Sequence, residues 1–325
     1  MHWVLFPVSA LAVIGGGIVV ARSGDRLADS LGLTRLWVGS ILVAAATSMP
    51  ELVVDVTAVR IEAADLAVGD LFGSSMANML ILAVLDLAFH RRKLLQSAAL
   101  DHVLTATLAI SLTAAAALSV VAAPGITLGP IGPATPVIAV AYLLGARVIH
   151  RRPGTTTERP STVRRAGSEV RRTMGLFLAG ALVILAAGPV LAISANDIAA
   201  DTGVDRTFVG VAALAMVTSL PELSVSIAAV RMGATDLAVG NLFGSNAFNM
   251  LILLPLDLSA SGSLLDSVSV ANVIAATAAV LMMSLAMMSL VLRAERRFAL
   301  VMPDAALVVA VYCLGLALVA ATADK

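Results

Sequence analysis

The chain has 325 residues, of which 59% are hydrophobic and only 13% are charged. Soluble domains are about half apolar and about 25% charged, so this composition argues against an ordinary soluble domain and against a disordered chain. The basic and acidic residues cancel to a net charge of zero, which removes the basic signature of nucleic-acid-binding proteins, and the one cysteine, Cys313, excludes an intrachain disulfide and a thiolate metal cluster. We expect a protein surrounded mostly by membrane lipid.

Hydrophobic stretches of about 20 residues, long enough to cross a bilayer as helices, follow one another along the chain. Ten can be drawn, at 3–22, 37–59, 65–89, 98–121, 134–149, 173–194, 207–230, 236–258, 268–292 and 300–322. The fifth of them is the shortest. Because they leave no room for a soluble catalytic domain, we expect an all-α integral membrane protein with ten transmembrane helices that is not an enzyme.

One connection, 150–172, is long, polar and rich in Pro, Thr and Arg. Of the 21 Lys and Arg residues, 18 lie in or beside the first, third, fifth, seventh and ninth connections between spans, and 150–172 is the fifth connection. The positive-inside rule places these connections in the cytoplasm and both termini outside. We expect a multi-pass protein of the plasma (cell inner) membrane, with arginines that set the topology and touch anionic lipid. No obligate protein partner is inferred.

Residues 39–87 recur as residues 210–258, without a gap, at an offset of 171. The segments TSMPELVVDVTAVR and TSLPELSVSIAAVR, which begin at Thr47 and Thr218, show the match. Each half holds five spans, and because five is odd the two copies enter the membrane from opposite sides. Such inverted repeats are typical of secondary transporters, which bind substrate near the membrane midplane. The predicted division is a first repeat, a cytoplasmic linker and a second repeat, at 1–150, 151–172 and 173–325.

Glu51 and Glu222 lie in the middle of the second and seventh spans, at equivalent positions of the repeat. An ionised carboxylate there costs at least about 2.5 kcal/mol unless it faces a polar cavity or a partner. The purely structural alternative is a protonated Glu that makes an interhelical hydrogen bond. Because the same Glu recurs in the same setting in both halves, we favour a functional site between the repeats.

A proline precedes each glutamate, Pro50 in the first half and Pro221 in the second. Proline lacks an N–H and clashes with the carbonyl four residues back, so each span is expected to kink or break there. Such a break frees backbone carbonyls around 44–46 and 215–217. The neighbouring hydroxyls are those of Thr47, Ser48, Thr218 and Ser219. Carboxylate, carbonyl and hydroxyl oxygens without histidine or thiolate suit hard cations, Ca²⁺ or Na⁺.

The third and eighth spans are expected to supply the facing wall of the site. Asp70, Ser74 and Asn78 follow one another at i, i+4 and i+8 and therefore share one helix face. The second copy has Asn241, Ser245 and Asn249 at the equivalent positions. Glycines four residues apart in both copies permit close helix packing of the GxxxG kind. We expect the glycines to pack and the polar residues to line the site.

The motif pair T-S-[ML]-P-E-L and G-[DN]-x-x-G-S-[SN]-x-x-N occurs once in each half. It resembles the alpha repeats of the sodium/calcium exchanger family, which belongs to the calcium/cation antiporter superfamily. The alpha-1 motif would be 39–87 and the alpha-2 motif 210–258. The resemblance implies transport by alternating access, with the first and sixth helices sliding across the core. It implies Ca²⁺ and Na⁺ as transported ions and no cofactor.

The resemblance also implies a role for each matched position. Glu51 and Glu222 match the paired acids that coordinate Ca²⁺ and Na⁺ at the centre of the site. The matched hydroxyl ligands are Thr47, Ser48, Thr218, Ser219, Ser74 and Ser245. Ala44 and Ala215 match positions whose backbone carbonyls bind sodium, and Asn78 and Asn249 match positions whose side chains lie in the middle of the site.

The chain departs from the family pattern in its first half. Asp70 stands where Asn is usual, and its equivalent is Asn241. Asp55, in the second span, is matched by Ser226. Spans two and three therefore hold three acids, whereas spans seven and eight hold only Glu222. We treat Asp70 as a further candidate ligand, since extra carboxylates could bind a proton or a divalent ion; the alternative is that both aspartates face water at the cavity rim.

The function that these observations predict is secondary active antiport of Ca²⁺ for Na⁺. Antiport of H⁺ for Ca²⁺, or for another divalent cation, stays open, as does a passive cation channel. An intramembrane aspartyl protease is a remote alternative, because residues 67–70 only partly match the motif G-x-G-D and the Asp is lost in the second copy.

Overall fold

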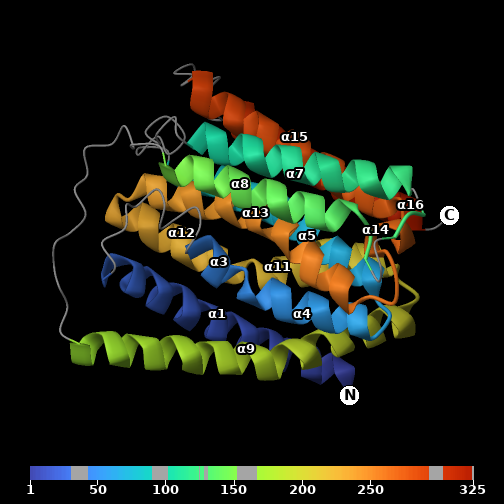
Figure 1. Cartoon of the computed structure of the whole chain (residues 1–325), viewed down its shortest axis with the longest axis horizontal. Helices are drawn as coiled ribbons and strands as arrows, with labels where there is room; N and C mark the ends of the chain where they lie inside the picture. Colours follow the sequence, from blue (N-terminus) through green and yellow to red (C-terminus); the bar gives the residue numbers. More distant parts are fainter. Residues whose placement is uncertain are drawn as a thin grey trace.

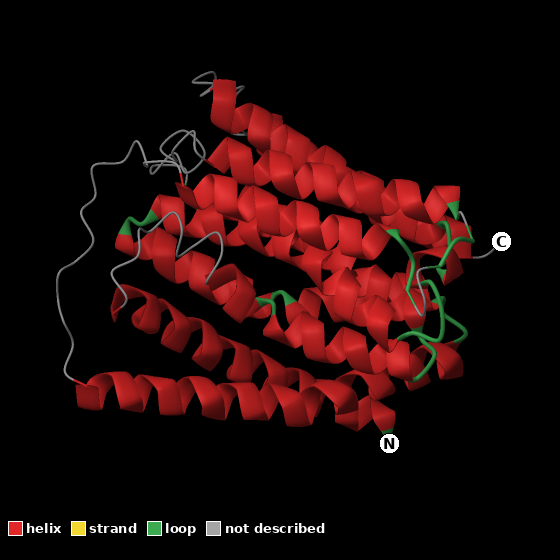
Figure 2. Cartoon of the chain, viewed as in Figure 1, coloured by secondary structure: helices red, strands yellow, loops and turns green. Residues whose placement is uncertain are grey.

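Helices make up nearly all of the computed structural model, which describes residues 1–30, 43–89, 102–123, 125–127, 131–151, 167–292 and 303–323. No strand occurs in this part of the chain, and the loops described gather mainly at one end of the helices (Figure 2). The prediction of an all-α protein is confirmed.

The helices alternate between long, nearly continuous elements and short broken ones. In chain order they are α1 (His2–Ser30), α3 (Ala44–Thr47), α4 (Met49–Arg60), α5 (Ala64–Ala88), α7 (His102–Ala122), α8 (Ala134–Arg151), α9 (Gly167–Thr202), α10 (Arg206–Val209), the π-helical turn η3 (Gly210–Leu214), α11 (Ala215–Thr218), α12 (Leu220–Met232), α13 (Thr235–Ser259), α14 (Leu264–Ser267), α15 (Ala271–Leu292) and α16 (Pro303–Ala323).

Seven of the helices in the described residues are long and apolar enough to cross a membrane. An eighth span is formed if the bent pair Arg206–Thr218 and Leu220–Met232 is counted as one. Two further predicted spans have helices that fall short of this test: the apolar part of α8 is only Ala134–Ile149, and the predicted span 37–59 begins outside the described residues. The chain is a multi-pass membrane protein, and the count of ten stays a prediction.

Two helices form the centre of the bundle. In α5 and α13, about four fifths of the most apolar stretch of the helix is buried inside the protein. In α1, α9 and α16, the buried share of that stretch is only about a third. Figure 1 shows α1 and α9 side by side at one edge and α7, α8 and α15 toward the other. A helix that is apolar all round belongs either in a core or against lipid. The central pair is therefore surrounded by protein, whereas the outer helices present apolar side chains to lipid.

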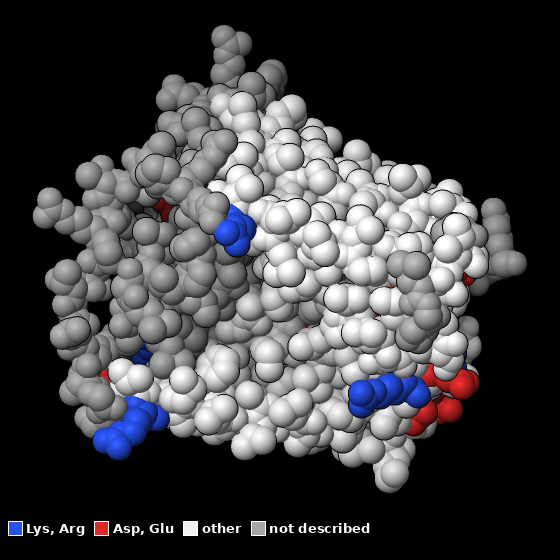
Figure 3. Space-filling model, viewed as in Figure 1, with Lys and Arg blue, Asp and Glu red and all other residues white. Residues whose placement is uncertain are grey.

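The surface agrees with this arrangement. Large apolar side chains such as Leu11, Leu182 and Leu314 are more than half exposed. On the face drawn in Figure 3, charged side chains lie toward the two ends of the helices, and a broad uncharged surface separates them. A soluble protein rarely exposes so continuous an apolar surface. The surface is that of a membrane protein whose helices run between two polar layers.

The helix α1 crosses α9 where two glycines meet. A Cβ atom on Gly16 would lie 3.0 Å from the carbonyl oxygen of Gly180, and a Cβ atom on Gly180 would lie 2.9 Å from that of Gly16. Only glycine permits this approach of the two backbones. The next residue, Gly17, faces the rings of Pro221 and Pro50. The α1 helix therefore lies directly over both predicted proline breaks.

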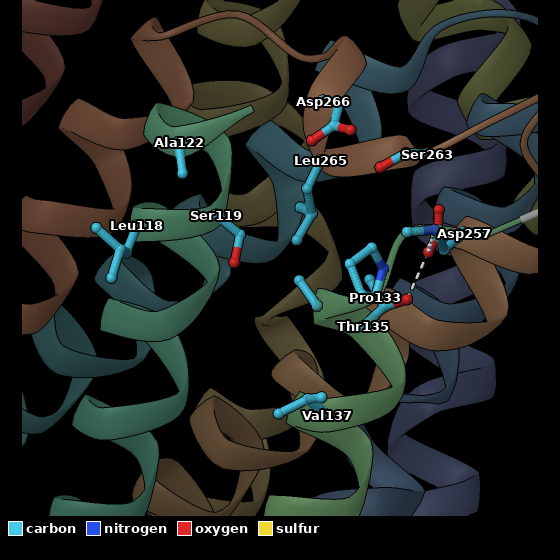
Figure 4. Close-up of a pocket in the computed structure, with 12 residues that line it drawn as sticks. Leu118, Ser119, Ala122, Pro133, Thr135, Val137, Asp257, Ser263, Leu265 and Asp266 are labelled. Atoms are coloured by element: carbon cyan, nitrogen blue, oxygen red, sulfur yellow. Dashed lines mark hydrogen bonds between the residues drawn. The ribbon is translucent and has the colours of Figure 1, made fainter. Parts of the chain in front are cut away.

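The end of α13 is held in place by a buried carboxylate. Asp257 accepts hydrogen bonds from the backbone N–H groups of Gly132 (3.0 Å) and Leu264 (2.7 Å) and from the hydroxyl of Thr135. It lines a cavity of about 350 Å³ with mostly apolar walls, between α7, α8 and α14 (Figure 4). These bonds tie the start of α8 and the segment before α14 to the central helix. Asp257 therefore has a structural role, at a distance from the broken helices.

Candidate cation-binding site

The two predicted helix breaks are present at equivalent residues. The α3 helix ends at Thr47 and α4 begins at Met49, with Ser48 between them in a non-helical conformation (φ −84°, ψ 12°). Ser219 separates α11 from α12 in almost the same conformation (φ −82°, ψ 3°). Each break is directly followed by a proline within the first turn of the next helix, where its missing N–H costs nothing. The prediction from Pro50 and Pro221 is confirmed.

Every residue predicted for the site lies in the interior of the protein. All of them are buried, with at most 1% of the surface of any one exposed: Ala44, Thr47, Ser48, Glu51, Asp70, Ser74, Asn78, Ala215, Thr218, Ser219, Glu222, Ser245 and Asn249. They come from the broken spans, which carry the glutamates, and from α5 and α13, which carry the facing polar side chains. Oxygen atoms from both halves of the chain therefore meet in the interior of the bundle.

Two hydroxyl contacts join the halves in a symmetrical way. The Thr47 hydroxyl lies 3.2 Å from that of Ser245, and the Thr218 hydroxyl lies 3.2 Å from that of Ser74. Thr218 is the repeat equivalent of Thr47, and Ser74 is the repeat equivalent of Ser245, so the two contacts are equivalent under the repeat. The same Thr hydroxyls also lie near the carbonyls of Ala44 (3.1 Å) and Ala215 (3.3 Å). The Ala44 and Ala215 carbonyls also accept hydrogen bonds from the backbone N–H groups of Ser48 and Ser219, so the breaks do not leave these two carbonyls free, contrary to the expectation from the prolines.

The two glutamates differ in their surroundings. The Oε1 atom of Glu222 accepts hydrogen bonds from Ser48 (3.4 Å) and Ser245 (3.3 Å). Both carboxylate oxygens of Glu51 are buried without a hydrogen-bond partner, as is Oε2 of Glu222. A buried carboxylate that accepts no hydrogen bond has lost its interactions with water without gaining any from the protein, which is energetically costly. Three buried carboxylate oxygens in the centre are thus available to a cation.

The aspartates of the first half are also buried. Asp55 and Asp70 have no exposed surface, so the interpretation that they face water at a cavity rim is wrong. Asp70 accepts a hydrogen bond from the Thr218 hydroxyl (3.0 Å). Within the described residues no basic side chain forms an ion pair with either aspartate or with the two glutamates.

Sequence reasoning passed over one residue that the structure places at the centre. The side chain of Asn246 accepts a hydrogen bond from the amide of Asn78 (2.9 Å) and donates to the backbone carbonyl of Ser75 (3.3 Å). It therefore links α13 to α5 beside the site. Its position in the motif G-S-[SN] was visible, but its counterpart Ser75 has a different side chain, so the repeat did not single it out. Asn249, by contrast, keeps both amide atoms unpaired and buried.

The donor set is that of a hard-cation site. The residues predicted for the site supply buried carboxylate, hydroxyl and amide oxygens and include no histidine or cysteine. In the part of the chain that the structure describes, no three His, Cys, Asp or Glu side chains form a group that could hold a metal ion, so a cation there would depend on neutral oxygens besides the carboxylates. Transition metals favour imidazole and thiolate ligands, whereas Ca²⁺ and Na⁺ favour mixed oxygen ligands. Among the residues predicted for the site, neutral oxygens outnumber the carboxylates.

Comparison with known proteins agrees with the geometry. The family model described as sodium/calcium exchanger protein matches residues 1–146 and 172–321. The inner membrane protein YrbG of Escherichia coli is 33% identical over 264 residues, which cover 76% of this chain and 78% of that protein. The putative antiporter CaxA of Alkalimonas amylolytica is 27% identical over 301 residues, or 86% of this chain and 90% of its own length.

Solved structures show the same fold. The sodium-calcium exchanger NCX_Mj, soaked with 10 mM Na⁺ and no Ca²⁺, superimposes with a TM-score of 0.65 at 18% identity and covers 97% of this chain and 98% of its own. Native YfkE superimposes with a TM-score of 0.67 at 17% identity, covering 98% of this chain and 94% of its own. Family and fold are those of transporters, and the protease alternative is set aside. The chain belongs to the sodium/calcium exchanger protein family.

Proposed function

We propose that the protein is a secondary active antiporter that exchanges Ca²⁺ for Na⁺ at the buried site between the two helix breaks. The observation that carries the proposal is the meeting of Glu51 and Glu222, with three unpaired carboxylate oxygens, inside a shell of hydroxyl and amide groups. The proposed ligands are the two glutamates with the hydroxyls of Thr47, Ser48, Ser74, Thr218, Ser219 and Ser245, the carbonyls of Ala44 and Ala215, and the amides of Asn78 and Asn249. Membership of the exchanger family supports the assignment.

The charge of the glutamate pair explains exchange rather than simple binding. Ionised Glu51 and Glu222 together neutralise one Ca²⁺, and sodium ions would balance the same charge in turn. With neither ion bound, two buried charges would have no compensation, which is costly in a low-dielectric interior. Return of the empty carrier is thereby disfavoured, so that movement of one ion requires movement of the other.

The fold supports alternating access. The contact pairs Thr47–Ser245 and Thr218–Ser74 are exchanged by the repeat offset, as expected if the halves are the inverted repeats 1–150 and 173–325. The α1 helix lies over both breaks through Gly17, and α9 packs beside it and against α4. We propose that α1 and α9 slide together across the core and open the site first to one side of the membrane and then to the other.

The test is calcium flux in vesicles that contain the purified protein, with sodium and pH gradients imposed separately. We expect an outward sodium gradient at constant pH to drive Ca²⁺ uptake, and the uptake to stop when sodium is replaced by choline. Calcium flux that follows the pH gradient and ignores sodium would reject sodium coupling. Flux of Ca²⁺ without any counter-ion would reject antiport altogether and favour a channel.

Exchange of H⁺ for Ca²⁺ is the second candidate. The observation that favours it is the pair of buried aspartates, Asp55 and Asp70, which adds two carboxyl groups close to the glutamates. Carboxyl groups are the groups in the site able to carry protons across the membrane. The pH arm of the vesicle experiment decides between the two coupling ions.

We also propose that both termini lie outside and that 150–172 is cytoplasmic, in the plasma (cell inner) membrane. The sorting of 18 of the 21 Lys and Arg residues supports this orientation. The exposed Cys313 would first be replaced by Ser, and a single Cys would then be introduced next to residue 150. A membrane-impermeant thiol reagent should label this Cys only after the cells are opened; labelling of intact cells would reverse the topology.

A further inference from the structure

The two halves differ at one pair of contacting residues beside the proposed site. In the second half, the side-chain amide of Asn241 donates a hydrogen bond to the hydroxyl of Ser226 (3.3 Å). The residues 171 positions earlier are Asp70 and Asp55, on α5 and α4. A donor and acceptor pair in one half is therefore replaced by two carboxyl groups in the other.

These two carboxyl groups lie against each other without a donor between them. Asp55 and Asp70 are within hydrogen-bonding reach of one another, and both are completely buried. Both oxygens of Asp55 and the Oδ2 atom of Asp70 have no hydrogen-bond partner; the other oxygen of Asp70 is held by the Thr218 hydroxyl. Ionised carboxylate oxygens only accept hydrogen bonds, so the pair is bridged either by a cation or by a proton that one of the two carboxyl groups carries.

Charge arithmetic indicates what is missing. One Ca²⁺ on Glu51 and Glu222 leaves the two aspartates uncompensated, and no basic side chain among the described residues pairs with them. Two unpaired charges in the interior of a membrane protein are too costly to persist, so the pair takes up either a counter-ion or protons. Both oxygens of Asp55 lack a hydrogen-bond donor, and the side chain within their reach, Asp70, is also acidic.

We infer that Asp55 and Asp70 bind a hard metal cation of their own, in a second site of the first half that is distinct from the Glu51–Glu222 pair. Ca²⁺ matches the double negative charge, and Na⁺ would share the same oxygen chemistry. Three free carboxylate oxygens are available as ligands, and the Thr218 hydroxyl, which donates to Asp70 and is also proposed for the central site, lies between the two sites. The inference rests on the proposed function for its choice of ions. A cation at this second site would add to the ions bound by the glutamates, and so would change the number of charges moved in each transport cycle.

The experiment counts bound ions. The purified protein in detergent is dialysed to equilibrium at constant pH against radioactive Ca²⁺ in one arm and radioactive Na⁺ in the other. The informative variant is the double substitution Asp55→Ser with Asp70→Asn, which copies the Ser226–Asn241 pair and so supplies a donor. We expect it to bind one cation fewer per chain at saturation, in the arm of the ion that occupies the site. An unchanged number in both arms would overturn the inference and favour a proton shared by the two carboxyl groups.

Matched controls separate a lost site from a damaged protein. The single substitution Asp55→Asn places an amide donor beside Asp70 with little change in shape, and it should cause the same loss of one ion if the double variant does not fold. The mirror variant Ser226→Ala alters the second half at the equivalent position and should leave the number of bound ions unchanged. A loss of one ion in this variant too would show that the count reports packing and would contradict the inference.

Failure of the inference can be told from failure of the proposed function. The ion count in detergent requires no transport, and the vesicle assay requires no count. If wild-type vesicles show no Ca²⁺ exchange while the aspartate variant still loses one ion, the second site stands and the proposed function falls. If exchange is normal and the count is unchanged, the proposed function stands and the second site falls.

Discussion

The two halves of the molecule share their backbone and differ in their charge. Both break a helix at a serine before a proline, and both place a threonine hydroxyl 3.2 Å from a serine of the other half. In the second half, Glu222 accepts two hydroxyl hydrogen bonds, and Asn241 and Ser226 bond to each other. In the first half, Glu51 accepts none, and two carboxyl groups take the place of the neutral pair.

This difference shows that a repeated backbone can carry unequal sites. The proline breaks and small residues set the shape in both halves, because they act through backbone geometry. The side chains added to that shape give Glu222 and Asn241 hydrogen-bond partners in the second half, and leave the carboxylates of Glu51 and Asp55 in the first half without donors. The following predictions test how far the asymmetry extends.

The largest effect is expected from neutralising either glutamate. Glu51→Gln and Glu222→Gln should each lower Ca²⁺ flux at least about 100-fold, because each removes half of the charge that balances Ca²⁺. Bound Ca²⁺ raises the midpoint of thermal unfolding of the wild type by mass action, and this shift should be lost in both variants. Flux in vesicles and unfolding in detergent are the measurements. If only the Glu51→Gln variant kept full Ca²⁺ flux, the glutamate of the second half would be sufficient for transport, and the two glutamates would not act as a pair.

The next effect is expected where α1 crosses the breaks. Gly17→Ala places a methyl group against the ring of Pro221, whereas Gly15→Ala meets no atom within 4 Å. Overpacking costs about 1–3 kcal/mol, so we expect Gly17→Ala to slow exchange about tenfold. Gly15→Ala is the control and should transport normally. The repeat counterpart Gly188→Ala meets the side chains of Val53 and Val54 at 2.8 Å or more, whereas Gly17→Ala meets the Pro221 ring more closely, so the effect of Gly188→Ala should be smaller. An effect equal to that of Gly17→Ala would make the two outer helices equivalent.

A smaller effect is expected from the asparagine that joins the central helices. Asn246→Ala removes the acceptor of the Asn78 amide and should lower the free energy of unfolding by about 1–3 kcal/mol. The hydroxyl of its counterpart in the first half, Ser75, donates only to the Leu71 carbonyl of its own helix. Ser75→Ala should therefore cost less than about 1 kcal/mol. Thermal unfolding of the two variants without added ions measures both changes in the free energy of unfolding. Equal decreases in the two variants would show that the halves do not differ at this position.

The smallest effect is expected from single hydroxyls. Ser245 contacts both Glu222 and Thr47, whereas Ser74 contacts Thr218 and Asp70 but neither glutamate. A hydrogen bond to a charged group is worth about 1.5–3 kcal/mol, so Ser245→Ala should change Ca²⁺ affinity about tenfold. Ser74→Ala should change it only about two- to threefold. A calcium titration of each variant compares them, and the reverse order would assign the principal cation to the first half.

Much of the fold and of the site could be predicted because the signals are local. Apolar stretches of about 20 residues predict spans whatever surrounds them. A proline in such a stretch removes one hydrogen bond of its own helix, and so Pro50 and Pro221 predicted both breaks. The spacing of Asp70, Ser74 and Asn78 places them on one face of α5 by helix geometry alone. The oxygen-rich composition of the site then followed from the sequence around the breaks.

The sequence by itself determined the membrane class, the duplication, the helix breaks and the residue types that meet between them. Only the tertiary structure decided which oxygens have partners: that Glu222 is held by two hydroxyls and Glu51 by none, that Asn246 joins the central helices, and that Asp55 lies buried against Asp70 and not at a rim. The physical reason is that spans and breaks arise within one helix, whereas a partner depends on how one helix is rotated and packed against another.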